Sequence, residues 1–210
     1  MKPLSIMLRE GTMDSHRSAE QTEFVKAFLK GNITRNLYAK HLSLLKLVYD
    51  ALERNLRASL SNPAVAKIHF PELERAREIE KDLQFFSMNA GESTPATDKY
   101  VARLNELGTS SPWLLAAHSY VRYLGDLSGG QALKRVAGKA LDLTSDGLRF
   151  YDFPAIGDIP GFKTVYREAL DSLPLDESQK QELVGEAVLA FDLNTGIFHD
   201  LEPLVERTPA

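Results

Sequence analysis

The sequence contains no cysteine. This absence excludes a disulfide framework, thiolate zinc sites, iron–sulfur clusters and a cysteine nucleophile. Long apolar runs are also lacking. The longest uncharged stretch, Leu107 to Val121, contains glycine, serine and proline and is shorter than the roughly 20 residues that span a bilayer. Because the N-terminus also lacks an apolar signal core, we expect a soluble protein with no membrane anchor.

Excess positive charge is absent too. The chain has 25 basic and 29 acidic residues, so its formal net charge is −4. This balance disfavours a protein that coats nucleic acid, and we expect no nucleic-acid partner. With 210 residues, of which 43% are hydrophobic, the chain is long enough to bury the core of one ordinary domain. We therefore expect a single domain over residues 1–210.

Strand-type alternation is scarce, whereas apolar residues recur at helical spacing through most of the chain. The predicted fold class is all-α. Thr34 and Asp176 precede two of the predicted helices as N-caps, and Asp176 with Gln179 resembles a capping box. The expected helices cover about residues 3–19, 24–29, 35–60, 71–88, 96–107, 112–140, 161–172 and 177–201.

Glycines interrupt the predicted helix 112–140. Gly125, Gly129 and Gly130 lie in its middle, and each costs roughly 1 kcal/mol relative to alanine in a helix interior. Three explanations are open. Gly125 and Gly129 lie on one face and permit close helix packing, or the helix ends at Gly129, or a kinked helix lays its bare backbone against a flat ligand.

Asp126 lies within the same apolar segment. A carboxylate in such a place needs a partner or water. Arg122, four residues earlier, is one candidate, and the two could form an ordinary surface ion pair. If Asp126 instead faces a pocket, its carboxylate can hold water beside a reacting atom.

The histidines show no E-x-x-H or H-E-x-x-H spacing, which disfavours a di-iron bundle and a zinc protease. His16 is distinguished by Glu20 four residues later, because a carboxylate there can orient an imidazole. A satisfied structural histidine is the simpler interpretation of His16 and of His118. His69 falls in a predicted loop, and His41 and His199 carry no further signal.

Two polar features lie in the C-terminal half. Asn194 interrupts an apolar stripe, which an interhelical hydrogen bond would explain. Lys163 and Arg167 are four residues apart on one helix face. They could hold paired carboxylates or phosphates, although a solvated helix face is the simpler interpretation.

The segment Ala117–Gln131, AHSYVRYLGDLSGGQ, resembles the signature of the biliverdin-producing haem oxygenases. The resemblance extends to the segment Leu8–Thr12 with His16 and Glu20, and to Phe70–Leu73 and Asp82–Phe85. Further matches with the same order and spacing are Phe162, Lys163, Tyr166, Arg167, Ala190, Phe191, Asn194 and Phe198. The resemblance covers residues 4–204, which we take as the core of the domain before a short polar tail. It is greatest for the soluble bacterial and cyanobacterial members of the family.

The resemblance implies a helical fold that holds haem b between a proximal and a distal helix. Haem is then both cofactor and substrate, opened by O2 and electrons to biliverdin, carbon monoxide and ferrous iron. His16 would ligate the iron, and Glu20 would orient the His16 imidazole. Gly125 and Gly129 would lie on the ring, and Asp126 would anchor distal water, supported by Tyr49, Arg122, Tyr123 and Asn194.

The resemblance also implies how the rest of the ring is held. Haem propionates would meet Arg9, Tyr120, Lys163 and Arg167, and Ser128 would also bind the haem, while Phe191 and Phe198 would shape the pocket wall. One departure is Met13, which stands where relatives often carry a basic residue. The family implies opening at the α-meso carbon and a ferredoxin or flavoprotein reductase as electron donor. Docking of that donor is expected at Arg9, Lys134, Arg135 and Lys139, and we expect a monomer.

Alternative functions differ in what they leave unexplained. A haem carrier or sensor of the same fold needs no distal carboxylate such as Asp126. The thiamine-salvage hydrolases share the helical architecture but need a nucleophilic cysteine, which this chain lacks. A pure interaction module would leave Gly125, Asp126 and Gly129 without a role.

Overall fold

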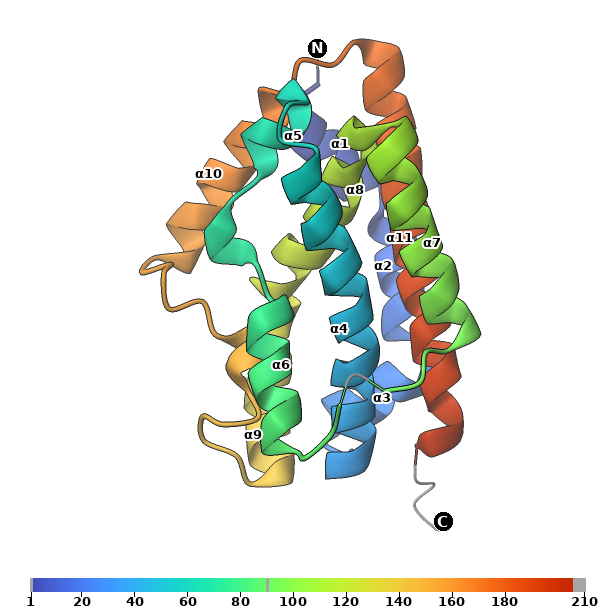
Figure 1. Cartoon of the computed structure of the whole chain (residues 1–210), viewed down its shortest axis with the longest axis vertical. Helices are drawn as coiled ribbons and strands as arrows, with labels where there is room; N and C mark the ends of the chain where they lie inside the picture. The colour runs from blue at the N-terminus through green and yellow to red at the C-terminus, as the bar shows by residue number, and fades with distance from the viewer. Residues whose placement is uncertain (1, 90, 206–210) are drawn as a thin grey trace.

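The computed structural model describes residues 2–89 and 91–205, and these are folded into packed helices (Figure 1). No β-strand occurs within the described ranges, which agrees with the predicted all-α class. None of the described helices is both long enough and apolar enough to cross a bilayer. The polar tail predicted after residue 204 lies, apart from Val205, outside the described residues.

Most of the helices follow one another with short connections, and the longest connection between two α-helices covers residues 142–158. The α-helices are α1 (Leu4–Gly11), α2 (Met13–Glu20), α3 (Glu23–Leu29), α4 (Arg35–Ala58), α5 (Pro63–Ile68), α6 (Ala76–Phe85), α7 (Pro95–Ser110), α8 (Leu115–Ser119), α9 (Gly129–Leu141), α10 (Ile159–Asp171) and α11 (Glu177–Leu201). A π-helical turn, η3 (Tyr120–Leu124), follows α8. Short 3₁₀ turns are η1 (Pro71–Leu73), η2 (Pro112–Leu114), η4 (Arg149–Tyr151) and η5 (Glu202–Leu204).

Two long helices organise the packing. Helix α4 contacts α6, α7 and α8, and α11 contacts α1, α2, α7 and α8 (Figure 1). Because α4 is covered on several sides, it buries polar as well as apolar side chains, among them His41, Tyr49 and Glu53. Both predicted N-caps are confirmed: Thr34 accepts a hydrogen bond from Leu37 N at 3.2 Å, and Asp176 with Gln179 forms the capping box.

The single helix predicted over residues 3–19 is wrong, because it is divided into α1 and α2 at Thr12. The Thr12 hydroxyl donates to the Leu8 carbonyl at 2.8 Å, a local bond that competes with regular helix geometry. Gly11, at the end of α1, is pressed against α11. A Cβ there would lie 2.5 Å from Cγ1 of Val184. The segment formed by α1 and α2 is thus bent at Thr12 and held close to α11.

Gly108 does not end the preceding helix, contrary to the prediction, since α7 continues to Ser110. The glycine allows α7 to approach α4: a Cβ at Gly108 would lie 2.2 Å from Oδ1 of Asn55. The Asn55 side chain is itself held by hydrogen bonds to Ala51 O and Asn105 Oδ1. A contact between distant segments therefore explains this glycine better than a helix stop does.

The predicted helix 71–88 is also divided, into η1 and α6. Glu53 of α4 causes the new start, because its Oε1 accepts hydrogen bonds from Arg75 N at 2.5 Å and Ala76 N at 3.0 Å. A side chain from another helix thus supplies the N-terminal cap of α6. Helix α5, which the sequence analysis did not predict, begins at Pro63, and the Asn62 side chain caps it.

The predicted helix 112–140 consists of four pieces: η2, α8, η3 and α9. After η3, the helix continues through Asp126 and then turns at Leu127 and Ser128 before α9 begins. Ser128 has φ −115° and ψ −90°, outside helical values. The alternative in which the helix ends at Gly129–Gly130 is wrong, since Gly129 begins α9. The kink of the third alternative is present, and its contact with a flat ligand stays a prediction.

His118 is a structural histidine, as expected. Its Nε2 lies 2.9 Å from Oε1 of Glu186, and its Nδ1 lies 3.3 Å from the Tyr100 hydroxyl. Arg103 also binds Glu186 through both carboxylate oxygens, at 3.0 and 2.6 Å. Burial alone would raise the pKa of Glu186, but the hydrogen bonds from His118 and Arg103 lower it to about 2. This cluster joins α7, α8 and α11.

Replacing Glu186 with glutamine should lower the free energy of unfolding at pH 7 by about 2 kcal/mol, because Arg103 then faces a neutral amide. The folded-state pKa lies below the ordinary value of 4.5, so this contribution is complete above pH 4.5 and is lost as the pH falls towards 2. Urea titrations across this range measure it. The exposed Glu182→Gln variant of α11 should change stability by less than about 0.5 kcal/mol, and equal losses in both variants would contradict the assignment.

Candidate active site

A cleft with two connected lobes lies beside the kinked segment. The outer lobe, about 540 Å³, lies between α1, α2, η3 and α10, and its lining includes Arg9, His16, Tyr120, Gly125, Ser128 and Arg167. The inner lobe, about 290 Å³, lies between α2, α4, α9 and α11, and its lining includes His41, Arg122, Asp126, Gly129, Asn194 and Phe198. His16, Glu20, Val121, Gly125, Gly129 and Phe191 line both lobes.

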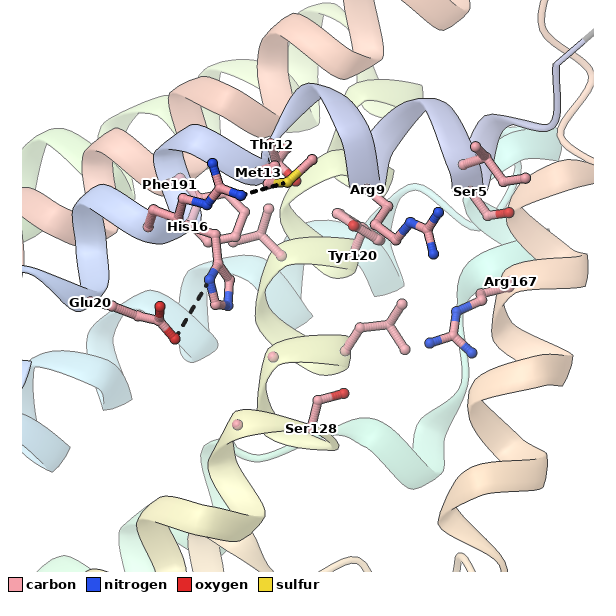
Figure 2. A pocket seen from close by; sticks show the side chains of 16 residues that line it. Ser5, Arg9, Thr12, Met13, His16, Glu20, Tyr120, Ser128, Arg167 and Phe191 are labelled. Atoms are coloured by element: carbon pink, nitrogen blue, oxygen red, sulfur yellow. Dashed lines mark hydrogen bonds and ion pairs between the residues drawn. The ribbon is translucent and has the colours of Figure 1, made fainter. Parts of the chain in front are cut away.

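His16 projects from α2 into the outer lobe (Figure 2). Its side chain is 58% exposed, although helices surround it, because it faces the cleft. Nδ1 lies 3.7 Å from Oε1 of Glu20, one helical turn further on, as the spacing predicted. Phe191 of α11 contacts the imidazole edge-on, with ring centroids 5.8 Å apart. His16 is therefore an accessible base and not a satisfied core histidine.

Gly125 and Gly129 form the opposite wall. A Cβ added at either glycine would meet no atom within 4 Å, so neither residue is required for close helix packing. Gly130 differs, because a Cβ there would lie 3.4 Å from Tyr151 Cδ1. The packing explanation is therefore wrong for Gly125 and Gly129. Their bare backbone faces open space across the cleft from His16.

A buried polar cluster lies behind this wall. The Tyr49 hydroxyl donates to Oδ2 of Asp126, Arg122 Nε donates to the Tyr49 hydroxyl at 3.1 Å, and Arg122 Nη1 donates to Oδ1 of Asn194. Arg122 Nη2 is 3.9 Å from Oδ1 of Asp126. Both charged residues are buried, so the surface-pair explanation is wrong. Tyr123 packs beside Tyr49, with ring centroids 6.1 Å apart.

The charges in this cluster are balanced. Burial raises the pKa of Asp126 to about 6, against the opposing effects of Arg122 and the Tyr49 hydrogen bond. The expected interhelical role of Asn194 is present too, since its amide oxygen joins α11 to η3 through Arg122. Asn194 and Asp126 nevertheless also line the inner lobe. The cluster therefore presents polar groups to the cleft while it holds three helical elements together.

Basic side chains gather at the mouth of the outer lobe. Arg9 of α1 and Arg167 of α10 approach it from different helices (Figure 2). Lys163 is outside the lining of either lobe, but its Nζ lies 3.3 Å from Oγ of Ser128, which does line the outer lobe. Lys163 and Arg167 thus both lie at one end of the cleft. The side of α10 that carries them faces the cleft as well as solvent.

Three further residues, Met13, His41 and His69, differ in how well the sequence predicted their places. Met13 lines the outer lobe, where the resemblance led us to expect a base, and Arg17 Nη2 contacts its sulfur at 3.3 Å. The sequence analysis missed His41, which lines the inner lobe. Its position within the apolar stripe of α4 was the available signal. His69 was predicted to lie in a loop, and in the structure it is the C-cap residue that follows α5.

The cleft fits a flat ring that carries iron and carboxylates. One wall offers backbone without side chains, the other offers an imidazole, and one end offers cations. No group of three His, Asp or Glu side chains in the described ranges converges to hold a metal ion. A metal that arrives within a macrocycle needs only an axial ligand such as His16.

Comparison with known proteins agrees with this fit. A family model described as haem oxygenase matches residues 2–200. The chain belongs to the haem oxygenase family. Haem oxygenase 1 of Synechocystis sp. is 42% identical over 203 residues, which cover 95% of this chain and 85% of the relative. Human haem oxygenase 1 is 42% identical over 209 residues, which cover 96% and 73% of the two chains.

Solved structures extend the similarity to three dimensions. Haem oxygenase from Leptospira interrogans superposes with a TM-score of 0.92 at 46% identity, covering 95% of this chain and all of that one. Synechocystis haem oxygenase-1 in complex with haem gives a TM-score of 0.94 at 42% identity, with coverage of 97% and 94%. The predicted family, fold and oxidoreductase class, with haem as substrate and cofactor and biliverdin as product, are confirmed.

Gly125→Ala should have opposite effects on stability and on haem binding. Gly125 has helical angles, φ −62° and ψ −49°, so alanine should raise the unfolding free energy of the haem-free protein by about 0.5–1 kcal/mol. Its methyl group would project into the cleft and weaken haem binding, measured by optical titration with hemin.

Gly185→Ala is the matched control, because a Cβ at this exposed position of α11 also meets nothing within 4 Å. It should be stabilising and leave hemin affinity unchanged. Unchanged hemin affinity in Gly125→Ala would show that this backbone does not face the ring.

Proposed function

We propose that this chain opens haem b oxidatively in the two-lobed cleft, with His16 as the axial iron ligand. The observation that carries the proposal is the bare backbone of Gly125 and Gly129 opposite an accessible imidazole. A side chain at either glycine would enter the space that a planar ring needs. Haem supplies the iron at which O2 is activated and also the ring carbon that is oxidised.

Glu20 sets the state of the proximal ligand. The nearest Glu20 oxygen lies 3.7 Å from Nδ1 of His16, so a hydrogen on Nδ1 would reach the carboxylate through water, which leaves the Nε2 lone pair free to bind a metal. Phe191 limits rotation of the imidazole from its side. This arrangement supports a neutral histidine ligand, which donates less electron density than a thiolate and so favours O–O cleavage less.

The distal cluster is suited to deliver protons. Oδ2 of Asp126 is occupied by the Tyr49 hydroxyl, whereas Oδ1 has only the longer contact with Arg122. Oδ1 can therefore accept a hydrogen bond from water in the cleft, and that water can direct its other hydrogen towards the reacting oxygen. Arg122 and Asn194 keep Tyr49 and Asp126 in place.

The ends of the cleft favour one orientation of the ring. Arg9, Tyr120, Ser128 and Arg167 would bind the propionates, with Lys163 beside Ser128, whereas Met13 contributes no charge. Phe191 lines both lobes and Phe198 lines the inner lobe as apolar walls. The glycine backbone blocks much of the ring, and attack at the α-meso carbon is the outcome we expect.

Several further expectations remain predictions. These are O2 as co-substrate, a ferredoxin or flavoprotein reductase as electron donor, a monomer and a cytoplasmic location. For donor docking, Lys134, Arg135 and Lys139 share α9, whereas Arg9 lies on α1 at the cleft mouth. Packing of α1 and α2 on α11 supports the single domain over residues 1–210, with its core at 4–204.

His16→Ala should remove the native axial ligand. Optical and electron paramagnetic resonance spectra of the ferric haem complex should lose the signature of a histidine-ligated iron, and biliverdin formation should fall at least about 100-fold. His199→Ala, which removes another exposed histidine, is the control and should leave both unchanged. A wild-type ligand-field spectrum in His16→Ala would remove His16 from the iron.

Asp126→Ala should retain haem binding but lose most biliverdin formation. We expect a hemin affinity within about threefold of wild type and a rate at least about 100-fold lower, the usual range for loss of positioned proton transfer. Reduction of the hemin complex in air, followed by absorbance of biliverdin, measures the rate. Normal turnover would show that the carboxylate is dispensable, and a wild-type Soret band that persists under these conditions would identify a haem carrier.

A further inference from the structure

Helix α1 begins without a capping side chain of its own. Its N-cap residue is Pro3, which gives the first turn no side-chain hydrogen bond. The missing acceptor is Asp171, the last residue of α10, which lies 166 positions away from Ser5 in the chain. Its Oδ1 accepts a hydrogen bond from Ser5 N at 2.7 Å, and its Oδ2 accepts one from the Ser5 hydroxyl at 2.9 Å. One carboxylate therefore holds the first turn of α1 through both of its oxygens.

Asp171 is unfavourably placed for its own helix. The C-terminal end of a helix carries a partial negative charge, so a carboxylate in the last turn of α10 is destabilising there. No basic residue in that turn compensates for it. The same carboxylate is favourable for α1, because the N-terminal end of a helix carries a partial positive charge and unpaired N–H groups. The residue thus serves the contact between the two helices and not α10 itself.

Helix α10 is bonded to both walls of the cleft. On the side of the kinked segment, the Tyr166 hydroxyl lies 2.6 Å from Oγ of Ser119, and Nζ of Lys163 lies 3.3 Å from Oγ of Ser128. On the side of α1, the two helices pack together and are joined by the hydrogen bonds to the Asp171 carboxylate. Helix α10 therefore connects the two walls at the mouth of the outer lobe.

The contact between Ser5 and Asp171 lies next to the arginines at the mouth. Arg9 follows Ser5 by one turn of α1, and Arg167 precedes Asp171 by one turn of α10. Residues four apart share a helix face, so each arginine lies on the same side of its helix as the contact. Ser5, Arg9 and Arg167 all line the outer lobe (Figure 2). The contact thus sets how far apart the two arginines are held.

We propose that Asp171 is a positioning residue for the substrate, because by holding Ser5 it fixes the separation of Arg9 and Arg167 and so the affinity of the mouth for the carboxylates of the ring. The inference rests on the proposed function, in which these arginines bind the propionates. Asp171 itself lines neither lobe. Its negative charge alone would weaken the binding of an anionic ligand, whereas its hydrogen bonds to α1 strengthen that binding.

Optical titration with hemin separates these two effects. Asp171→Ala should weaken hemin binding about fivefold, the usual effect of one lost hydrogen bond, although the change removes a negative charge. Asp171→Asn should bind hemin as wild type does, since an amide can accept from Ser5 N and donate to the Ser5 hydroxyl. Unchanged or tighter binding in Asp171→Ala, or no recovery in Asp171→Asn, would overturn the proposal.

Glu168→Ala is the matched control. It removes an exposed carboxylate from the same end of α10, and Glu168 lines neither lobe. Hemin affinity in this variant should stay within about twofold of wild type, because a screened surface charge has little effect. A loss as large as that in Asp171→Ala would show that any acid removed from α10 weakens binding, which contradicts a specific role of Asp171.

A second ligand separates positioning from a general loss of structure. Hemin dimethyl ester lacks the carboxylate charges, so Asp171→Ala should leave its affinity unchanged. In a chain that already carries Arg167→Ala, the further change Asp171→Ala should have little effect on hemin affinity, because the two residues act on one interaction. Equal losses for hemin and its dimethyl ester, or fully additive losses in the double variant, would reject the positioning role.

Amide hydrogen exchange in the haem-free protein tests the contact itself. Exchange in the first turn of α1 should be faster in Asp171→Ala and close to wild type in Asp171→Asn. Ser5→Ala loses only the hydroxyl bond, should weaken hemin binding less, and serves if Asp171→Ala does not fold. Unchanged exchange would show that the carboxylate does not hold α1 and would overturn the proposal. Failure of wild type to bind hemin would instead overturn the proposed function, and the exchange result would still decide whether Asp171 holds α1.

Discussion

The bare backbone at Gly125 and Gly129 is the constraint on which the rest of the structure depends. Gly125, inside helical structure, costs about 1 kcal/mol relative to alanine, and no close helix contact offsets that cost. The π-helical turn before Gly125 and the irregular Ser128 between the two glycines weaken the segment further. A domain with only 5–15 kcal/mol of net stability retains such a segment when the rest of the fold holds it in place. Contacts of α8 and η3 with α4 and α11 supply that support.

Polar bonds complete this support and also prepare the site. Tyr49 belongs to α4, Arg122 to η3 and Asn194 to α11, so one chain of hydrogen bonds ties the weakest segment to the two longest helices. A buried charge is tolerated only when its partners are all present, because each missing bond leaves a desolvated group unpaired. The geometry of Asp126 is therefore fixed by the same contacts that stabilise the kinked segment, and its orientation does not depend on a flexible side chain.

The sequence predicted features that depend on neighbours along the chain. The caps at Thr34 and Asp176 and the His16–Glu20 pair are set by residues at most four positions apart, and the structure shows each of them. Features set by distant residues were missed. Glu53 starts α6 from another helix, and Gly108 serves a contact with Asn55. His41 looked like one more member of an apolar stripe, because the lobe beside it is formed by helices far away in sequence. The roles of individual site residues follow from family resemblance and remain predictions.

The two lobes separate two electrostatic requirements of a haem-degrading site. Propionates are permanent anions at neutral pH, and the cations that suit them, Arg9 and Arg167, are at the mouth, where water screens their mutual repulsion. Proton delivery needs groups whose charges are compensated, and the buried Asp126 with its nearby Arg122 meets this requirement beside the inner lobe. A ring that binds with its carboxylates at the mouth places its apolar edge towards the inner lobe. Under the proposed function, the cations at one end and the buried cluster at the other would set both the direction of the ring and the place where protons arrive.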